Sequence, residues 1–97
     1  MERLTPAIKA QLPQLYATEN DLDPTAQVKF FTPDSSWTWY ATEFDGEDLF
    51  FGLIQGHCEE LGYFRLSELQ TTKGPMGLAI ERDRGFEPTP LSKLRGN

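Results

Sequence analysis

The chain has little of the chemistry that most often reveals a function. Its 97 residues include one cysteine, Cys58, and one histidine, His57. No apolar run approaches the roughly 20 residues of a membrane helix, and the opening residues lack the apolar core of a signal peptide. A single cysteine excludes an internal disulfide. We therefore expect a cytoplasmic protein without a membrane partner, built as a single domain over residues 1–97.

Basic residues are also scarce in the middle of the chain. The net charge is −6, and residues 19–60 hold ten acids and one base, Lys29, whereas residues 61–97 hold six bases and four acids. An acidic segment repels phosphates and attracts basic partners. We therefore expect a protein partner with a basic or apolar surface, unless the acidic and basic segments interleave in space. The ten acids are Glu19, Asp21, Asp23, Asp34, Glu43, Asp45, Glu47, Asp48, Glu59 and Glu60.

Aromatic residues, in contrast, are concentrated in one segment. Eight of the twelve lie between Phe30 and Phe51, on either side of the pair Asp45-Gly46. An Asp-Gly pair between alternating apolar residues predicts a β-hairpin with a two-residue turn. That turn would place Glu43 opposite Asp48. Both faces of the hairpin would carry large apolar side chains, so the sequence leaves open whether a given face is core or exposed.

The remaining patterns predict an α+β domain. We expect a mainly antiparallel four- to five-stranded sheet, a meander, with a short N-terminal helix packed on one face. Thr5-Pro6 begins that helix, and Pro13 should kink or split it near Leu12. The expected elements are a helix at about residues 5–17, strands at about residues 26–32, 37–44, 47–54, 62–66 and 78–83, and a C-terminal turn or short helix at about residues 90–94.

The candidate catalytic and metal-binding groups are incomplete. His57 and Cys58 are adjacent, and neighbouring side chains in an extended chain point in opposite directions. The acids of residues 19–24 lack the glycine and the twelfth-position acid of a calcium loop. We therefore predict no catalytic residue, no metal and no cofactor, and we predict that the protein is not an enzyme.

The candidate partner-binding residues lie on the predicted hairpin. An aromatic centre with a charged edge is typical of a protein interface. The leading hypothesis is a non-enzymatic module that binds another protein. One version is an inhibitor of a host defence enzyme whose acidic surface imitates DNA, and the alternative for the carboxylates is a solvated turn. The candidate residues are Trp37, Trp39, Phe50, Glu43, Asp45, Glu47 and Asp48.

A second hypothesis from a different class is single-stranded nucleic-acid binding. Exposed aromatic side chains would stack on bases, and Arg65, Arg82 and Arg84 would neutralise phosphates. The acidic middle of the chain disfavours it, because Lys29 is the one base among the aromatic residues.

Several runs of residues resemble a known family. The run from Trp37 to Gly46, Trp-Thr-Trp-Tyr-Ala-Thr-Glu-Phe-Asp-Gly, is the most specific, and shorter runs lie at residues 12–19, 28–33, 61–64 and 80–83. Together they resemble the bacterial family catalogued as domain of unknown function 2958, over about residues 4–94. The resemblance implies a small stand-alone protein of plasmids, integrated elements and phages. It implies no activity and no site residues.

Overall fold

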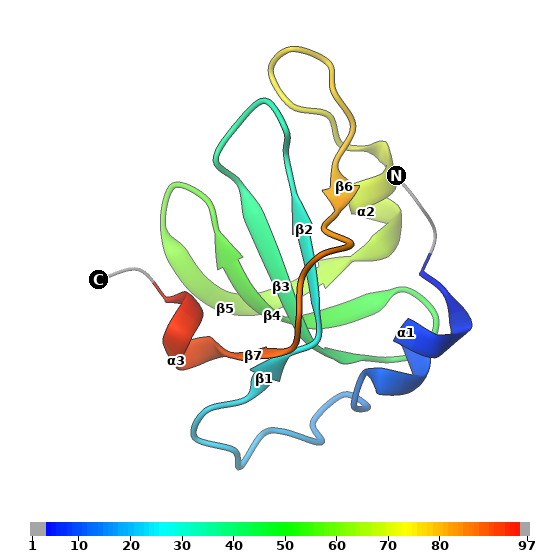
Figure 1. Cartoon of the computed structure of the whole chain (residues 1–97), viewed down its shortest axis with the longest axis vertical. Coiled ribbons are helices and arrows are strands. Elements are labelled where there is room, and N and C mark those ends of the chain that lie inside the picture. The colour runs from blue at the N-terminus through cyan, green and yellow to red at the C-terminus, as the bar shows by residue number, and fades with distance from the viewer. Residues whose placement is uncertain (1–3, 96–97) are drawn as a thin grey trace.

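An antiparallel sheet of five strands forms the centre of the molecule (Figure 1). The computed structural model describes residues 4–95. Strands β2 to β5 are consecutive neighbours, and β6 joins the free side of β2, so the strand order is β5-β4-β3-β2-β6. The predicted α+β class with an antiparallel meander is confirmed. The strands are β2 (Val28–Phe31), β3 (Thr38–Phe44), β4 (Leu49–Gln55), β5 (Glu59–Arg65) and β6 (Glu81–Arg82).

Smaller elements surround this sheet. The helices are α1 (Pro6–Gln11), α2 (Leu66–Thr71) and α3 (Leu91–Leu94), and β1 (Thr25–Ala26) pairs with β7 (Thr89–Pro90) in a separate two-stranded sheet. β5 begins three residues earlier than expected, at Glu59. The last strand of the main sheet is shorter than residues 78–83, because Ala79 instead forms a bridge with Lys73.

Helix α1 is set by its capping residues. The Ile8 amide donates to Thr5 Oγ1 at 3.2 Å, and Pro6 occupies the first turn, where its missing N–H is not needed. The helix ends at Gln11, earlier than the expected residue 17, because Pro13 cannot donate a helical hydrogen bond. The Pro13 carbonyl accepts instead from the Phe44 amide at 2.9 Å, so the chain after α1 is attached to β3.

The hairpin is present, but the expected two-residue turn is wrong. Residues 45–48 form the connection, and Asp45 Oδ1 accepts from the amides of Glu47, Asp48 and Leu49 at 2.8, 2.8 and 3.0 Å. The β3–β4 register also shifts between Ala41 and Glu43, at a β-bulge. An extra residue on one strand turns the following side chains to the other face. Glu43 therefore does not oppose Asp48 but pairs with Phe51.

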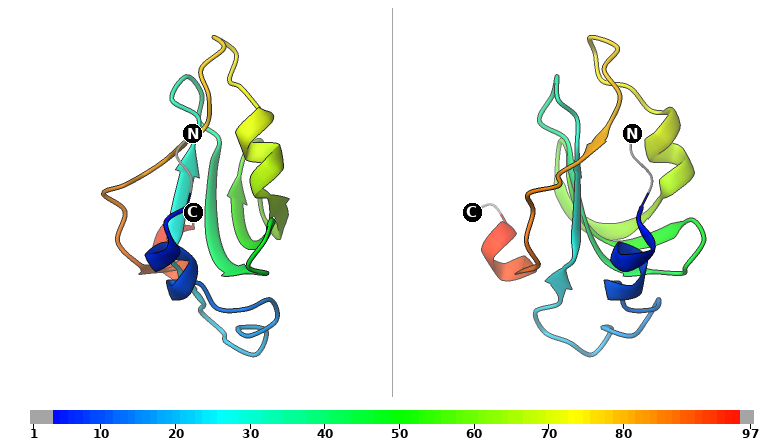
Figure 2. Two further views of the ribbon diagram at one scale, coloured as in Figure 1. Left: turned by 90° about the vertical axis from the view of Figure 1, so that its right-hand side faces the viewer. Right: turned by 45° about the vertical axis from the view of Figure 1, so that its right-hand side comes forward.

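One face of the main sheet carries an aromatic core. Phe50 is completely buried, and its ring lies 4.4 Å from that of Phe44 and 5.2 Å from that of Phe64, centroid to centroid. The right-hand view of Figure 2 shows α1 and α2 on this side of the sheet and α3 on the other. The buried members of this core are Leu4, Leu12, Val28, Phe30, Trp39, Ala41, Phe44, Phe50, Phe64, Leu69 and Ile80.

The opposite face is only partly covered. Ala26, Tyr40, Leu53 and Leu91 form a second, smaller cluster, against which Phe86 and Leu94 pack. Gln55 Nε2 donates to the Leu94 carbonyl at 2.8 Å and holds α3 over this cluster. The cover ends before it reaches the outer strand β5, where Leu61 and Tyr63 remain exposed. None of the helices between residues 4 and 95 is long and apolar enough to cross a membrane.

Candidate functional site

The three aromatic candidates of the hairpin do not form an exposed surface. Phe50 has no exposed area and Trp39 is 8% exposed, and both belong to the aromatic core. Trp37 is half-buried, and it lines a hollow of about 370 Å³ together with Trp39 and the loop at Gly74. Their burial in the aromatic core removes Trp39 and Phe50 from direct contact with a partner.

Glu43 is also buried, at 3% exposure. Its carboxylate accepts from the amides of Tyr16 and Thr18 at 2.8 and 2.9 Å and from the Thr18 hydroxyl. The bulge makes this possible, because it turns Glu43 away from the aromatic core toward the segment after α1. Glu43 is therefore a structural residue and cannot be part of an exposed acidic edge.

The other carboxylates of the hairpin lie at the surface, and two of them organise the backbone. The three amides that donate to Asp45 lower the pKa of its carboxyl. Asp48 accepts from the amide and the hydroxyl of Ser67 at 2.8 Å each, which lowers the pKa of Asp48. Arg65 lies 3.7 Å from Asp48 and completes the contact. Among these turn residues, Glu47 is exposed at the tip of the loop.

His57 and Cys58 lie in the exposed turn between β4 and β5. The His57 ring packs edge-on against Trp37, with 5.4 Å between centroids. Within residues 4–95, no group of three or more His, Cys, Asp or Glu side chains could hold a metal ion. In this structure, His57 acts as a packing partner of Trp37.

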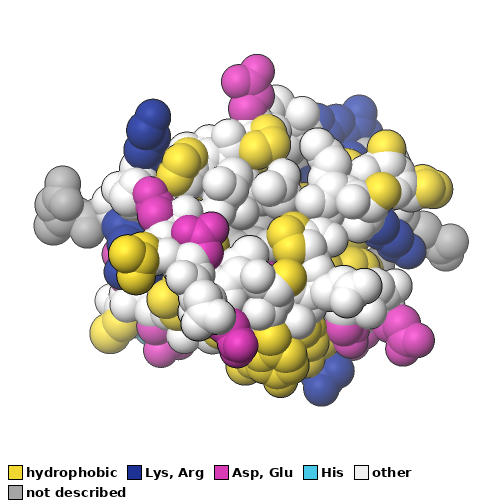
Figure 3. Space-filling view, turned by 90° about the horizontal axis from the view of Figure 1, so that it is seen from below, with side chains coloured by type: hydrophobic (Ala, Val, Ile, Leu, Met, Phe, Trp, Pro, Cys, Tyr) yellow, Lys and Arg dark blue, Asp and Glu magenta, His cyan; other side chains and the backbone are white. Residues whose placement is uncertain are grey.

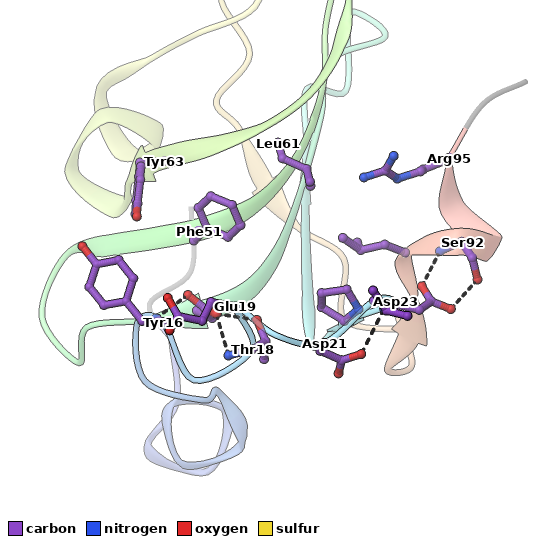
Figure 4. A pocket seen from close by; sticks show the side chains of 14 residues that line it. Tyr16, Thr18, Glu19, Asp21, Asp23, Phe51, Leu61, Tyr63, Ser92 and Arg95 are labelled. Carbon is purple, nitrogen blue, oxygen red and sulfur yellow. Dashed lines mark hydrogen bonds between the residues drawn. The ribbon is translucent and has the colours of Figure 1, made fainter.

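A different surface is open. A groove of about 590 Å³ lies between the segment after α1, the outer face of β4 and β5, and α3 (Figure 4). Tyr16 and Tyr63 stand at one end and are 62% and 49% exposed, and Leu61, in the middle, is 47% exposed. The Phe51 ring forms the floor and lies 5.0 Å from that of Tyr63. These four side chains give the groove an apolar wall.

Tyr16 is held in a strained backbone conformation to reach this groove. Its φ is +69°, and it is the one described non-glycine residue with a positive φ. This left-handed conformation costs a non-glycine residue roughly 1–2 kcal/mol. The hydrogen bond from the Tyr16 amide to Glu43 offsets that cost and holds the backbone at Tyr16 in place.

The Tyr16 and Tyr63 side chains lie at the same end of the groove (Figure 4). The nearby Tyr16 side chain raises the pKa of Tyr63, and the partial desolvation of Tyr63 acts in the same direction. Tyr63 therefore stays neutral at physiological pH. The rings present apolar faces and a neutral polar edge, which is the combination that favours tyrosine at protein interfaces.

The rim of the groove is acidic. Glu19, Asp21 and Asp23 lie along it, and Arg95 is the one base among its described lining residues. Figure 3 shows acidic and exposed apolar side chains next to each other at the end of the molecule where this loop lies. Asp23 accepts from the amide and the hydroxyl of Ser92 at 2.9 and 2.6 Å, which lowers the pKa of Asp23 and ties the rim to α3.

The arginines proposed for nucleic acid do not share a surface with each other. Arg65 ends β5 and Arg82 lies in β6, and these are the two opposite edge strands of the sheet. Four strand spacings separate them, roughly 19 Å. Arg84 follows β6 on the far side. None of the three arginines lines the groove, whose one base among the described lining residues is Arg95.

Of the seven residues predicted to bind a partner, Glu43 alone lines this groove, and it is buried. The sequence reasoning missed the exposed rings of Tyr16 and Tyr63. The alternation of Leu61 and Tyr63 about Gly62 was a usable signal for β5, because alternate residues share a face. Nothing in the sequence indicates that Tyr16 joins them, since its position depends on the buried contact with Glu43.

A comparison with known protein families gives one match over nearly the whole chain. The model of a family described as "Protein of unknown function (DUF2958)" matches residues 3–94. The chain belongs to the DUF2958 family. The resemblance carried by the Trp37–Gly46 run is thereby confirmed. No curated protein and no solved structure matches the chain. The function of this DUF2958 protein therefore has to be argued from its groove.

Proposed function

We propose that this DUF2958 protein is a non-enzymatic binding module whose groove receives an apolar, basic segment of another protein. The observation that carries the proposal is the set of exposed rings at one open groove, with carboxylates on its rim. The partner is of the type that the sequence suggests, a protein with a basic or apolar surface. The proposed binding surface is the groove instead of the hairpin.

The apolar wall supplies the attraction. Tyr16, Phe51, Leu61 and Tyr63 come from three separate segments and converge on one hollow. Tyrosine is enriched among the residues that dominate binding energy, because a large ring loses little conformational entropy on burial. The strained Tyr16 backbone also favours a functional role, since strain persists where the surrounding structure needs a side chain in one place.

The acidic rim supplies the selectivity. The rim carries three acids, Glu19, Asp21 and Asp23, and one base, Arg95. A lysine or arginine beside an apolar residue of the partner therefore gains a favourable contact. Charges at an exposed rim act mainly on the rate of association and are screened by salt. Binding should therefore weaken moderately as the salt concentration rises.

The lining of the groove supports binding more than catalysis. Its described residues include no histidine, cysteine or lysine, which are the side chains that most often act as a base or nucleophile near neutral pH. In keeping with the resemblance, we place the protein as an accessory factor of a mobile element.

The version in which an acidic surface imitates DNA has less support than the groove. Such imitation needs carboxylates that are free to act as phosphates. Six of the ten acids between residues 19 and 60 accept hydrogen bonds from backbone amides instead: Asp21, Asp23, Asp34, Glu43, Asp45 and Asp48. Their positions are therefore set by the fold.

Selection from a display library of short random peptides tests the proposal. We expect the enriched peptides to combine lysine or arginine with aromatic or aliphatic residues. Titration of one such peptide should give an affinity that Tyr63→Ala lowers by about tenfold or more. Asp21→Lys should lower the affinity at low salt and have less effect at high salt.

Met76→Ala is the matched control, because Met76 is strongly exposed at the tip of the loop between α2 and β6, away from the groove. It should leave the affinity unchanged. Enrichment of acidic peptides, or equal losses from Tyr63→Ala and Met76→Ala, would contradict the proposal.

A further inference from the structure

Strand β5 is an open edge of the main sheet. It pairs with β4 on one side, and the strand order places no described strand on its other side. Its middle, Leu61-Gly62-Tyr63-Phe64, is apolar and carries no charge or proline, the devices that usually protect an edge. At the opposite edge β6 has only two residues. The two edges thus differ in their capacity to pair.

The outward backbone groups of β5 follow from two hydrogen bonds at its end. The Arg65 amide donates to Glu68 Oε1 at 3.1 Å, and the Leu49 amide donates to Asp45 Oδ1. Paired Leu49 and Arg65 therefore do not bond to each other. Because bonded and non-bonded pairs alternate, the backbone groups of Leu61 and Tyr63 also point away from β4.

These outward groups have no partner elsewhere in the described chain. Between residues 4 and 95, no loop or side chain bonds to the backbone of Leu61 or Tyr63 from outside the sheet. Both side chains are about half exposed on the groove face. A row of free backbone groups beside apolar side chains is a template for another strand.

We propose that this strand is β5 of a second copy of the protein, paired antiparallel about a two-fold axis at Gly62. In this register Leu61 faces Tyr63 of the second copy, and Glu59 faces Arg65 of the second copy. The outward backbone groups of Leu61 and Tyr63 then bond to those of the second copy, whereas the Arg65 amide keeps its bond to Glu68.

The β5 sequence is complementary to itself in this register alone. Glu59 and Arg65 have opposite charges and lie at equal distances from Gly62, so each end of the interface places a carboxylate opposite a guanidinium group. This contact adds to those that Glu59 makes with Gln55 and Arg65 makes with Asp48. Gly62 meets its own copy in a non-bonded pair, where the strands approach most closely and a missing side chain is an advantage. If the pairing of the two β5 strands shifted by one residue, residues whose amides point toward β4 would face residues whose amides point outward. If it shifted by two, Glu59 and Arg65 would no longer face each other.

Pairing at this edge joins the two sheets and their grooves. The two-fold axis stands perpendicular to the sheet, so the groove faces of both copies lie on the same side. The proposal goes beyond the proposed function and does not depend on it, because it uses the backbone of β5. A single paired strand gives a small interface, so we expect weak, reversible association.

Sedimentation equilibrium between about 10 µM and 1 mM tests the pairing in a range where weak dimers dissociate. We expect the average mass to rise toward that of a dimer with concentration. Glu59→Arg and Arg65→Glu should each weaken the dimer by about tenfold, since each places two like-charged pairs opposite each other. The double variant should restore the association.

Glu60→Arg is the matched control. It changes the net charge by the same amount as Glu59→Arg, but residue 60 points to the other face and pairs with Phe64 of the second copy. It should not weaken the dimer. A monomer at every concentration, or equal effects of Glu59→Arg and Glu60→Arg, would overturn the proposal.

Amide exchange gives a second measurement that does not depend on variants. The amides of Leu61 and Tyr63 should exchange more slowly as the protein concentration rises, whereas those of Gly62 and Phe64 should not change. Association without this protection would show that the copies meet at another surface and would also overturn the proposal.

Discussion

At the scale of single residues, carboxylates hold distant parts of this chain together. Glu43 binds the segment after α1, and Asp23 binds the first turn of α3. Asp48 binds the first turn of α2, and Asp34 Oδ2 accepts from the Met76 amide at 2.7 Å. Each of these contacts joins residues that are 19 to 69 positions apart. Acids that look like a solvated surface in the sequence are therefore part of the tertiary structure.

Replacing Glu43 tests this role. In Glu43→Gln one side-chain oxygen is lost, so one of the partly buried amides of Tyr16 and Thr18 loses its acceptor. An unpaired buried polar group, together with the loss of a charged hydrogen bond, should lower the free energy of unfolding by about 2–3 kcal/mol. Urea denaturation measures this change.

Glu47→Gln is the comparison, since Glu47 is exposed at the hairpin tip. Exposed positions of this kind change stability by about 0.5 kcal/mol or less. Similar losses from the two variants would mean that the buried carboxylate contributes nothing specific.

At the scale of elements, the sequence predicted the strands better than their register. Alternating apolar residues located β2, β3 and β4, and Thr5, Pro6 and Pro13 bounded α1. The register failed at Asp45, whose side chain closes a longer turn, and at the bulge after Ala41. Both features depend on hydrogen bonds that a pattern of apolar residues does not predict. Asp45 accepts from the amides of its own turn, and Glu43 accepts from the amide of Tyr16, 27 positions away.

Two paired glycines on neighbouring strands test the packing of the hairpin. A Cβ at Gly52 would lie 1.8 Å from the Tyr40 carbonyl oxygen, whereas a Cβ at Gly62 would meet its nearest atom, in Ile54, at an ordinary 3.7 Å. We expect Gly52→Ala to lower the free energy of unfolding by about 3 kcal/mol or more, because the clash is with backbone.

Gly62→Ala should change stability by less than about 1 kcal/mol. Thermal unfolding of both variants at low protein concentration measures the difference. A well-folded Gly52→Ala protein with unchanged stability would contradict the described closeness of β3 and β4.

At the scale of the whole molecule, the elements that pack on the main sheet determine which of its side chains are exposed to a partner. One face is closed by α1, α2 and the aromatic core, and the other is closed only as far as α3 reaches. The sequence predicted an acidic, aromatic surface but could not show which rings are exposed. Both Trp39 and Tyr63 lie in apolar strand segments, but Trp39 belongs to a core with residues that are distant along the chain, such as Leu4 and Ile80.

The stability of the whole fold should fall in acid. The pKa values of Asp23, Asp45 and Asp48 are lowered in the folded protein because serine or backbone donors bond to the charged carboxylates. A lowered folded pKa stabilises the protein above the ordinary value, near pH 3.8, and this contribution is lost as the pH falls toward the folded value. Urea denaturation between pH 7 and pH 2.5 should show a steep decline below about pH 4.

Ser67→Ala and Ser92→Ala should each make that decline shallower, because they remove donors to Asp48 and Asp23. Ser36→Ala, at an exposed position of the β2–β3 turn, is the control and should leave the decline unchanged. If all three variants keep the profile of the unmodified protein, the serine contacts do not set the acid sensitivity.

The carboxylates that join distant parts of the chain also limit how the composition of this protein can change. The sequence has an isoelectric point of about 4.6, and part of that acidity belongs to the architecture. A redesign toward a neutral isoelectric point could replace Glu47 and Glu60 but would have to retain Glu43, Asp48 and Asp23. Related chains that have lost Glu19 and Asp21 from the rim should therefore still retain Glu43, Asp48 and Asp23. A low isoelectric point and membership of the family are then separable properties.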